Sequence, residues 1–357
     1  MDTPDDRVAS PAAATPAAAL VALAVYLAVA ATLLQSALFG DDVVSPGAYF
    51  AQSGPFPVAL RQQVPEGINL LSDRVNQFMP WLRYAADSYA IDGHLPLWKS
   101  LASCGAPFVG NGQSALFFPT NLLAILIGAP PWVHAAQSLI KLAAGAFCAY
   151  LLARHLRLSF LAALLAGLVF GFGGFQAVFL QHPHTNVSLL LPLLLLAADR
   201  AVLSPTRGRI ACLALVAGLQ HLGGHAETAA HSQLAAAALG LLRAWSLRRA
   251  PPGTTSTLAA PLGRRLAALA GGLLLGAALG AIQILPQLEY ISESDTLDLR
   301  TRLADELAAT AQPLAPRLLF LAALALALLC VRHLARGRRP LGLAVAAAVL
   351  LAAVALG

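Results

Sequence analysis

The chain has 357 residues, of which 58% are hydrophobic and only 11% are charged, and its mean hydropathy is +0.70. Soluble domains carry about 25% charged residues, so this composition excludes an ordinary soluble protein. The net charge of +6 does not indicate nucleic-acid binding, because the basic residues separate apolar runs instead of clustering in one segment. Abundant Ala and Leu favour helices over a membrane barrel, whose strands would alternate with a period of two.

The charges are sorted along the chain. Arginines fill the short gaps near residues 154–157, 200–209, 243–265 and 332–339, whereas 13 of the 17 acidic residues lie in the alternate gaps, where histidines also collect. An excess of Arg and Lys marks cytoplasmic loops. The sequence therefore predicts an all-α polytopic membrane protein with a cytoplasmic N-terminus and an extracytoplasmic polar face.

The N-terminal third predicts one span followed by a long outer segment. Residues 1–16 are acidic and rich in Pro and Ala, which is typical of a disordered cytoplasmic tail. The apolar run Ala17–Leu38 is long enough to be a first, uncleaved span. Residues 40–118 then form an extracytoplasmic loop, and long loops are usually functional. Within it, residues 73–90 have helical spacing, with one apolar face formed by Val75, Phe78, Met79, Leu82 and Ala86.

The rest of the chain predicts eight more spans. Residues 121–128 are apolar but bounded by prolines and too short to cross, so we expect an interfacial or re-entrant segment. Further spans are expected at about 132–153, 158–180, 186–199, 209–222, 226–243, 265–286, 316–333 and 341–356. With the first span these make about nine transmembrane helices in one domain, residues 17–357. Two pairs of spans meet at polar outer breaks, QHPHTN at 181–186 and QHLGGHAE at 220–227.

Polar side chains from four separate regions are expected to converge on the outer face. Ionisable groups at the membrane edge are costly and are functional candidates. The candidates are Asp73, Arg74, Gln77, Arg83, Trp98, Asn111, Gln113, His182, His184, His225, Glu227, Gln283, Glu289 and Arg300.

Several candidates also have a structural interpretation. Asp73 opens a predicted helix and would serve as its N-cap. His182 and His184 flank a proline at a helix junction and would cap free carbonyls, and His225 would form a structural hydrogen bond between helices. A divalent cation, Mg²⁺ or Mn²⁺, is compatible with Asp73, His225 and Glu227, but no spacing of the HExxH type requires a metal. Lys141 lies inside a span, where we expect it to snorkel or to pair within the bundle.

The order of these segments resembles the YfhO-like family of bacterial membrane proteins. The resemblance starts at DRVNQFMPWLRY (73–84) and GHLPLWKSLASCGAPFVGNGQSALFFP (93–119). It continues at FGFGGFQAVFLQHPHTN (170–186), LPLLLLAADR (191–200), GGHAETAAHSQL (223–234) and AIQILPQLEY (281–290), so it covers about residues 18–300. One departure is Lys99, which follows Trp98 where the family often has Asn.

The resemblance implies the GT-C class of glycosyltransferases, in which an acidic residue early in the first outer loop acts at the acceptor. The matching position is Asp73, as general base of an inverting transfer from a polyprenyl-phosphate-linked sugar to an extracytoplasmic glycan, lipid or protein. Arg74, Arg83, His182, His184 and Arg300 are candidates to offset the charge of the leaving phosphate. Trp98, Asn111 and Gln113 suit sugar or headgroup contacts. The expected location is the bacterial cytoplasmic membrane.

Two other functions remain open from the sequence. A catalytically silent partner or scaffold of a glycosylation complex would share the same fold. A transporter or flippase would also use broken helices. The chain has no evident inverted repeat, and its polar groups crowd one face instead of the midplane, which argues against transport.

Overall fold

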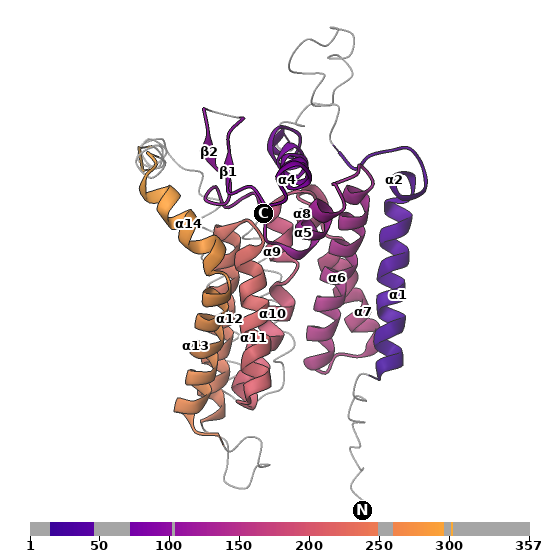
Figure 1. The fold of residues 1–357 in the computed structure, drawn as a ribbon. Coiled ribbons are helices and arrows are strands. Elements are labelled where there is room, and N and C mark those ends of the chain that lie inside the picture. Colours follow the sequence, from indigo (N-terminus) through magenta and orange to yellow (C-terminus); the bar gives the residue numbers. More distant parts are fainter. Residues whose placement is uncertain (1–14, 46–71, 102–103, 249–259, 296–300, 303–357) are drawn as a thin grey trace, which may run out of the picture.

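A computed structural model describes residues 15–45, 72–101, 104–248, 260–295 and 301–302 of the protein (Figure 1). The described part is predominantly helical, as the sequence predicts. The elements are α1 (Pro16–Leu33), α2 (Gln35–Phe39), the π-helix η3 (Arg74–Phe78), α4 (Met79–Asp92), β1 (Trp98–Lys99), β2 (Ala106–Pro107), α5 (Pro119–Leu126), α6 (Val133–His155), α7 (Phe160–Gly171), α8 (Gly174–Val178), α9 (Pro183–Ser188), α10 (Leu191–Leu203), α11 (Arg207–Leu222), α12 (Ala226–Leu247), α13 (Leu262–Leu279) and α14 (Ala281–Ser292).

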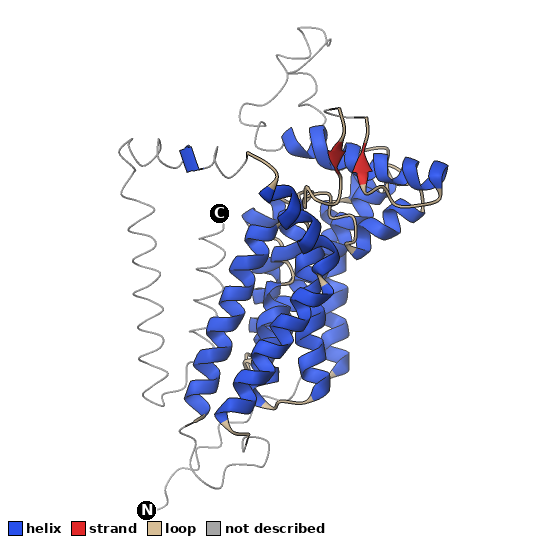
Figure 2. Ribbon diagram, turned by 60° about the vertical axis from the view of Figure 1, so that its left-hand side comes forward, coloured by secondary structure: helices blue, strands red, loops and turns tan. Residues whose placement is uncertain are grey.

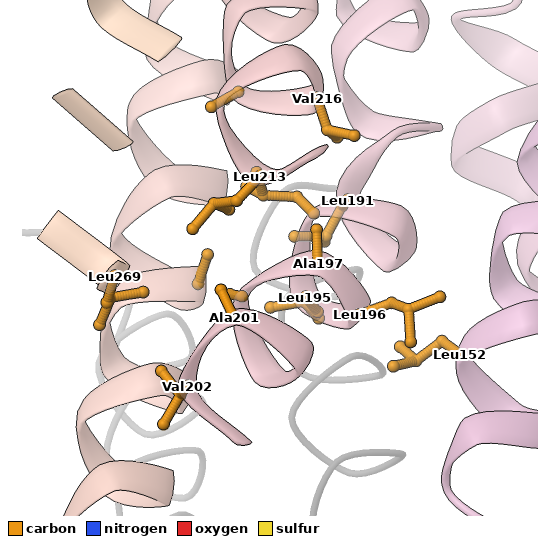
Figure 3. Packing of buried hydrophobic residues seen from close by; sticks show 14 of the residues in the cluster. Leu152, Leu191, Leu195, Leu196, Ala197, Ala201, Val202, Leu213, Val216 and Leu269 are labelled. Carbon is orange, nitrogen blue, oxygen red and sulfur yellow. The ribbon is translucent and has the colours of Figure 1, made fainter. Parts of the chain in front are cut away.

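The long helices form a bundle around α10. Helix α10 packs against α6, α11, α12 and α13, while α11 lies along α13, and α7 and α1 cover α6. The core between α10, α11 and α13 is built from leucine, valine and alanine, including the fully buried Leu194, Val202 and Leu213. Figure 3 shows side chains of this core, among them Val202, Leu213 and Leu269. A polar network lies beside this core: the buried Asp199 of α10 pairs with His155 of α6 at 2.6 Å and with Arg243 of α12 at 3.0 Å.

Four helical segments of the described chain are long and apolar enough to cross a membrane. They are Pro16–Leu33, Val133–His155, Pro183–Leu203 and Leu262–Leu279. The first coincides with the predicted first span, and its start follows from Thr15, whose hydroxyl accepts a hydrogen bond from the Ala18 amide at 3.3 Å. The full count of nine spans stays a prediction, and the expected spans 316–333 and 341–356 lie outside the described residues.

Three of the expected spans are interrupted. The segment 158–180 divides into α7 and α8 at Phe172–Gly173, and the segment 186–199 belongs to a longer pair of helices, α9 and α10, that begins at Pro183. The segment 265–286 divides into α13 and α14 at Gly280. Proline favours the first turn of a helix over its interior, and Pro183 and Pro192 occupy the first turns of α9 and α10. Hydropathy alone does not show these interruptions, because the residues around them are apolar.

A platform at one end of the bundle is made of η3, α4, α5 and the β1–β2 hairpin (Figures 1 and 2). The predicted helix over residues 73–90 is present, and Val75, Phe78, Leu82 and Ala86 are buried as its spacing indicates. Its first turn is a π-helix, which the sequence pattern did not predict. The two strands pair antiparallel, with Trp98 opposite Pro107.

Close packing of α7 against α1 and α6 depends on Gly167. A Cβ atom there would collide with the Tyr26 hydroxyl and lie 2.7 Å from the Ala146 carbonyl oxygen. We expect Gly167→Ala to lower the free energy of unfolding by roughly 1–3 kcal/mol, because the added methyl overpacks the contact. Gly271→Ala is the control, since nothing lies within 4 Å of its Cβ position. Denaturant unfolding in detergent measures both, and equal effects would contradict the packing argument.

Candidate functional site

The two polar helix breaks are joined to each other by side-chain amides. The Asn186 Nδ2 donates to the Gly223 carbonyl at 2.9 Å, and the Gln220 Nε2 donates to the Val187 carbonyl at 3.1 Å. Both side chains are buried. Backbone groups freed by a helix break must be satisfied inside the protein when no water is available. These amides supply the missing donors and fix the 181–186 break against the 220–227 break.

The loop before α5 and helix α14 contact the same region. The backbone at Gly224 has a φ of +88° and comes so close to the loop that a Cβ atom would lie 2.7 Å from the Ala115 Cβ. On the other side, the buried Gln283 of α14 donates to the Val109 carbonyl at 2.7 Å. The four sequence regions that carry the candidate residues are therefore in contact at one end of the bundle.

A polar pocket lies where η3, α5, α6 and the 181–186 break meet. Its lining includes two cationic side chains, Arg74 and Lys141, and no carboxylate among the described residues. The polar lining residues are Arg74, Gln113, Ser114, Asn121, Gln137, Lys141, Gln181, His182 and Asn186. We call this set the cationic pocket. Three predicted candidates, Arg74, Gln113 and His182, contribute to it.

Arg74 is held in the pocket by groups that do not neutralise its charge. Its side chain is buried, its Nη2 contacts His134 Nδ1 at 2.8 Å, and its Nη1 donates to the Gln181 carbonyl at 3.5 Å. A guanidinium only donates, so the His134 Nδ1 must be an unprotonated acceptor. Burial lowers the pKa of Arg74 to about 9, which leaves the guanidinium charged at neutral pH.

The second cation comes from a polar stripe on α6. Lys141 Nζ donates to the Leu180 carbonyl at 3.3 Å, and Gln137 Nε2 donates to the Thr120 carbonyl and to Asn121 Oδ1, both at 3.0 Å. His134, Gln137, Ser138 and Lys141 recur every three or four residues, so they share one face of the helix. Sequence reasoning missed all of this stripe except Lys141, which it expected to pair in the bundle. The spacing of four polar residues inside an apolar span was the available signal.

His182 is buried in the wall of the pocket as a neutral ring. Neither ring nitrogen has a hydrogen-bond partner, and the rings of Phe78 and Phe179 approach edge-on at 5.2 and 5.5 Å. Burial, followed by the charges of His184, Arg74 and Lys141, lowers the pKa of His182 to about 4. His182 therefore neither caps a carbonyl nor supplies positive charge at neutral pH, and both of those sequence-based interpretations are wrong.

Asp73 is exposed beside the pocket and does not cap a helix. Its backbone is already helical, it makes no capping hydrogen bond, and its Oδ1 accepts from Gln77 Nε2 at 3.0 Å. The carboxylates of Asp73 and Glu227 both lie close enough to His184 to interact with it electrostatically. Asp73 therefore does not have the N-cap role that the sequence offered as an alternative.

His184 of the first break and His225 of the second break lie together. The rings of His184 and His225 are 3.7 Å apart between centroids. His225 caps α12, with its Nδ1 accepting from the Thr228 amide at 3.2 Å. This hydrogen bond lies within one helix, so the expected hydrogen bond between helices stays a prediction. Within the described residues, no group of three or more His, Cys, Asp or Glu side chains is arranged to hold a metal ion. The sequence-based grouping of Asp73, His225 and Glu227 around Mg²⁺ or Mn²⁺ is therefore not supported.

The other candidates do not enter the pocket. Arg83 forms an exposed ion pair with Asp87 at 2.8 Å, and Trp98 is 55% exposed on the hairpin. Asn111 Oδ1 accepts from the Ser114 amide at 2.9 Å and shapes the loop. Glu289 is exposed on α14, and Arg300 lies outside the described residues.

Comparison with protein-family models, curated proteins and solved structures found no match to the chain. The resemblance to the YfhO-like family thus stays an expectation carried by the residues quoted above.

The neutral state of His182 predicts a pH dependence of stability. The unfolded ring takes up a proton below pH 6.5, whereas the folded ring does so only near pH 4. Unfolding therefore takes up a proton in this window, and the free energy of unfolding must fall as pH falls from about 6.5 to about 4. His182→Phe removes the titration and should flatten this part of the profile. Parallel profiles of the two proteins in detergent would contradict the assignment.

Proposed function

We propose that the protein is a membrane glycosyltransferase that moves a sugar from a polyprenyl-phosphate donor to an extracytoplasmic acceptor in a bacterial cytoplasmic membrane. The observation that carries the proposal is the cationic pocket, which the buried Arg74 and the half-buried Lys141 line without a carboxylate among the described lining residues. Backbone carbonyls and a neutral histidine hold both side chains, and none of these groups neutralises the charge of Arg74. A phosphate group is the anion that this arrangement suits, since amide and hydroxyl donors line the same pocket.

The charge of the pocket favours departure of the phosphate. A sugar linked through a phosphodiester carries one negative charge, and the polyprenyl phosphate released by transfer carries close to two at neutral pH. The positive charge of Arg74 and Lys141 interacts more strongly with the released polyprenyl phosphate than with the phosphodiester. Interactions that strengthen toward the transition state accelerate the chemical step, whereas equal binding of both states does not. We assign this role to Arg74, one of the five candidates from the sequence, and to Lys141, which the sequence analysis had not assigned to it.

Asp73 is the group proposed to accept the proton of the acceptor hydroxyl. It directly precedes Arg74, and successive helical residues differ by about 100° in direction, so one side chain is exposed while the next is buried. The acceptor oxygen would form a bond to the anomeric carbon as the bond from that carbon to the phosphate oxygen breaks. The proton would pass to the Asp73 carboxylate. The neighbouring His184 and Glu227 are candidates to contact the acceptor.

Replacement of the proposed base tests the reaction. We expect Asp73→Asn to lower transfer from a polyprenyl-phosphate sugar by about 10²- to 10⁴-fold while binding of the donor persists, because an amide cannot accept the proton. Asp92→Asn, which removes an exposed carboxylate at the end of α4, should leave transfer unchanged. Release of polyprenyl phosphate in nanodiscs measures turnover. Full activity of Asp73→Asn would sink the assigned mechanism.

Replacement of the buried cations tests the phosphate site separately from turnover. We expect Arg74→Gln and Lys141→Gln each to raise the Kd for polyprenyl phosphate by roughly 10- to 100-fold, since each removes a charge-assisted hydrogen bond. Arg207→Gln, at the exposed start of α11, is the control and should bind as the wild type does. Calorimetry in detergent measures binding. Unchanged affinity in both pocket variants would show that the cations serve only to hold the backbone.

The same two measurements separate the alternatives. A catalytically silent scaffold would bind polyprenyl phosphate or none, but would show no turnover in the wild type. A transporter or flippase would move the lipid without cleaving the bond to the sugar. The cationic pocket lies at one end of the bundle, and the core between α10, α11 and α13 is built from Leu, Val and Ala, which favours chemistry at one face over passage through the middle.

A further inference from the structure

Helix α5 has its apolar residues on the outside as well as the inside. Ala124 and Ile125 are buried against the platform core, and Asn121 lines the cationic pocket. By contrast, Leu123, Leu126 and Ile127 are 62%, 55% and 53% exposed. With eight residues the helix is too short to cross a membrane, and a water-exposed helix of a platform would carry polar residues at these positions.

The exposed apolar surface of α5 continues along α6. Trp132, which directly precedes α6, is 58% exposed, and Ile140 is 49% exposed. Trp132, Ala136, Ile140 and Ala144 follow each other at four-residue intervals, so they lie on one face of the helix. The opposite stripe, from His134 to Lys141, faces the pocket. Because α6 is one of the segments able to cross a membrane, its exposed apolar stripe is the side that lipid would contact.

We propose that Leu123, Leu126, Ile127 and Trp132 are seated in the acyl-chain region of a lipid leaflet. We call these four residues the lipid ridge. The occupant is lipid because the ridge is continuous with the exposed face of a candidate span and ends in a tryptophan, which is enriched at membrane interfaces. Helix α5 and the linked Gln137 then separate the leaflet from the cationic pocket. Gln137 of α6 connects α6 to α5 by donating hydrogen bonds to the Thr120 carbonyl and to Asn121 Oδ1.

This arrangement gives a lipid-borne phosphate a short route to the pocket. Asn121 and Leu123 are two residues apart on the same short helix, yet one lines the pocket and the other is exposed. A lipid whose chains contact the ridge would therefore hold its headgroup at the level of Asn121. The lipid ridge does not depend on sugar transfer, since it holds equally for a scaffold that only binds lipid phosphate.

Fluorescence of the full chain in vesicles tests the ridge. Wild type, Trp132→Phe and Trp98→Phe are each reconstituted in phosphatidylcholine whose acyl chains are brominated or unmodified. Trp98 is the matched control, because it is 55% exposed but lies on the hairpin of the platform. We expect Trp132→Phe to lose a larger share of the bromine-dependent quenching than Trp98→Phe. Iodide in the aqueous phase should show the opposite order.

Two other quenching results would overturn the proposal. Trp132 emission quenched by iodide but not by brominated lipid would place the ridge in water. Emission quenched by neither would mean that protein covers the ridge, either a second copy of this chain or another partner. Ile127→Trp in the Trp132→Phe background guards against a local change caused by the single substitution. Restored bromine quenching in that double variant supports the ridge, and its absence counts against it.

Discussion

Broken helices inside an apolar bundle are the constraint on which the rest of this structure depends. Each break leaves carbonyl groups that no helical partner reaches, and a nonpolar environment makes an unsatisfied group cost several kcal/mol. The protein answers with long polar side chains. Asn186 and Gln220 donate to the Gly223 and Val187 carbonyls at the two breaks. Gln283 donates to the Val109 carbonyl in the loop before α5, and Lys141 donates to the Leu180 carbonyl after α8. The polar end of the bundle is thus required by the backbone before any ligand is considered.

The need to hydrogen-bond these carbonyls also bears on why Arg74 and Lys141 are present. An amide such as Gln181 or Gln137 satisfies a carbonyl without bringing a net charge into the bundle, and this protein uses amides at most of these positions. At Gln181 the donor is instead Arg74, and at Leu180 Lys141 donates in addition to the Thr185 hydroxyl. Burying an uncompensated charge is far more costly than burying an amide. Capping alone therefore does not account for the choice of these two residues, whereas an anion that visits the pocket does.

The sequence predicts the helical architecture and fails where tertiary contacts decide. Hydropathy and the sorted charges locate α1 and α6, and the apolar spacing of residues 73–90 identifies the buried face of α4. The divisions at Gly173 and Gly280 were missed because their neighbours are as apolar as the helices. In the site, chemical type singled out Arg74 and Gln113, but it also selected Arg83, which an exposed pair with Asp87 holds outside the pocket. Burial, which only the fold determines, separates Arg74 from Arg83.

His182 and Asp73 show why residue type does not settle a role. The histidine was expected to supply positive charge, yet the side chains packed around it and the two cations behind it keep its ring neutral. The aspartate was expected to be a cap or a base, and its helical backbone without a capping hydrogen bond removes the cap. What remains is an exposed carboxylate directly followed by a buried guanidinium. A site that must take a proton on one side and hold a phosphate on the other requires this division of charge between wet and dry environments.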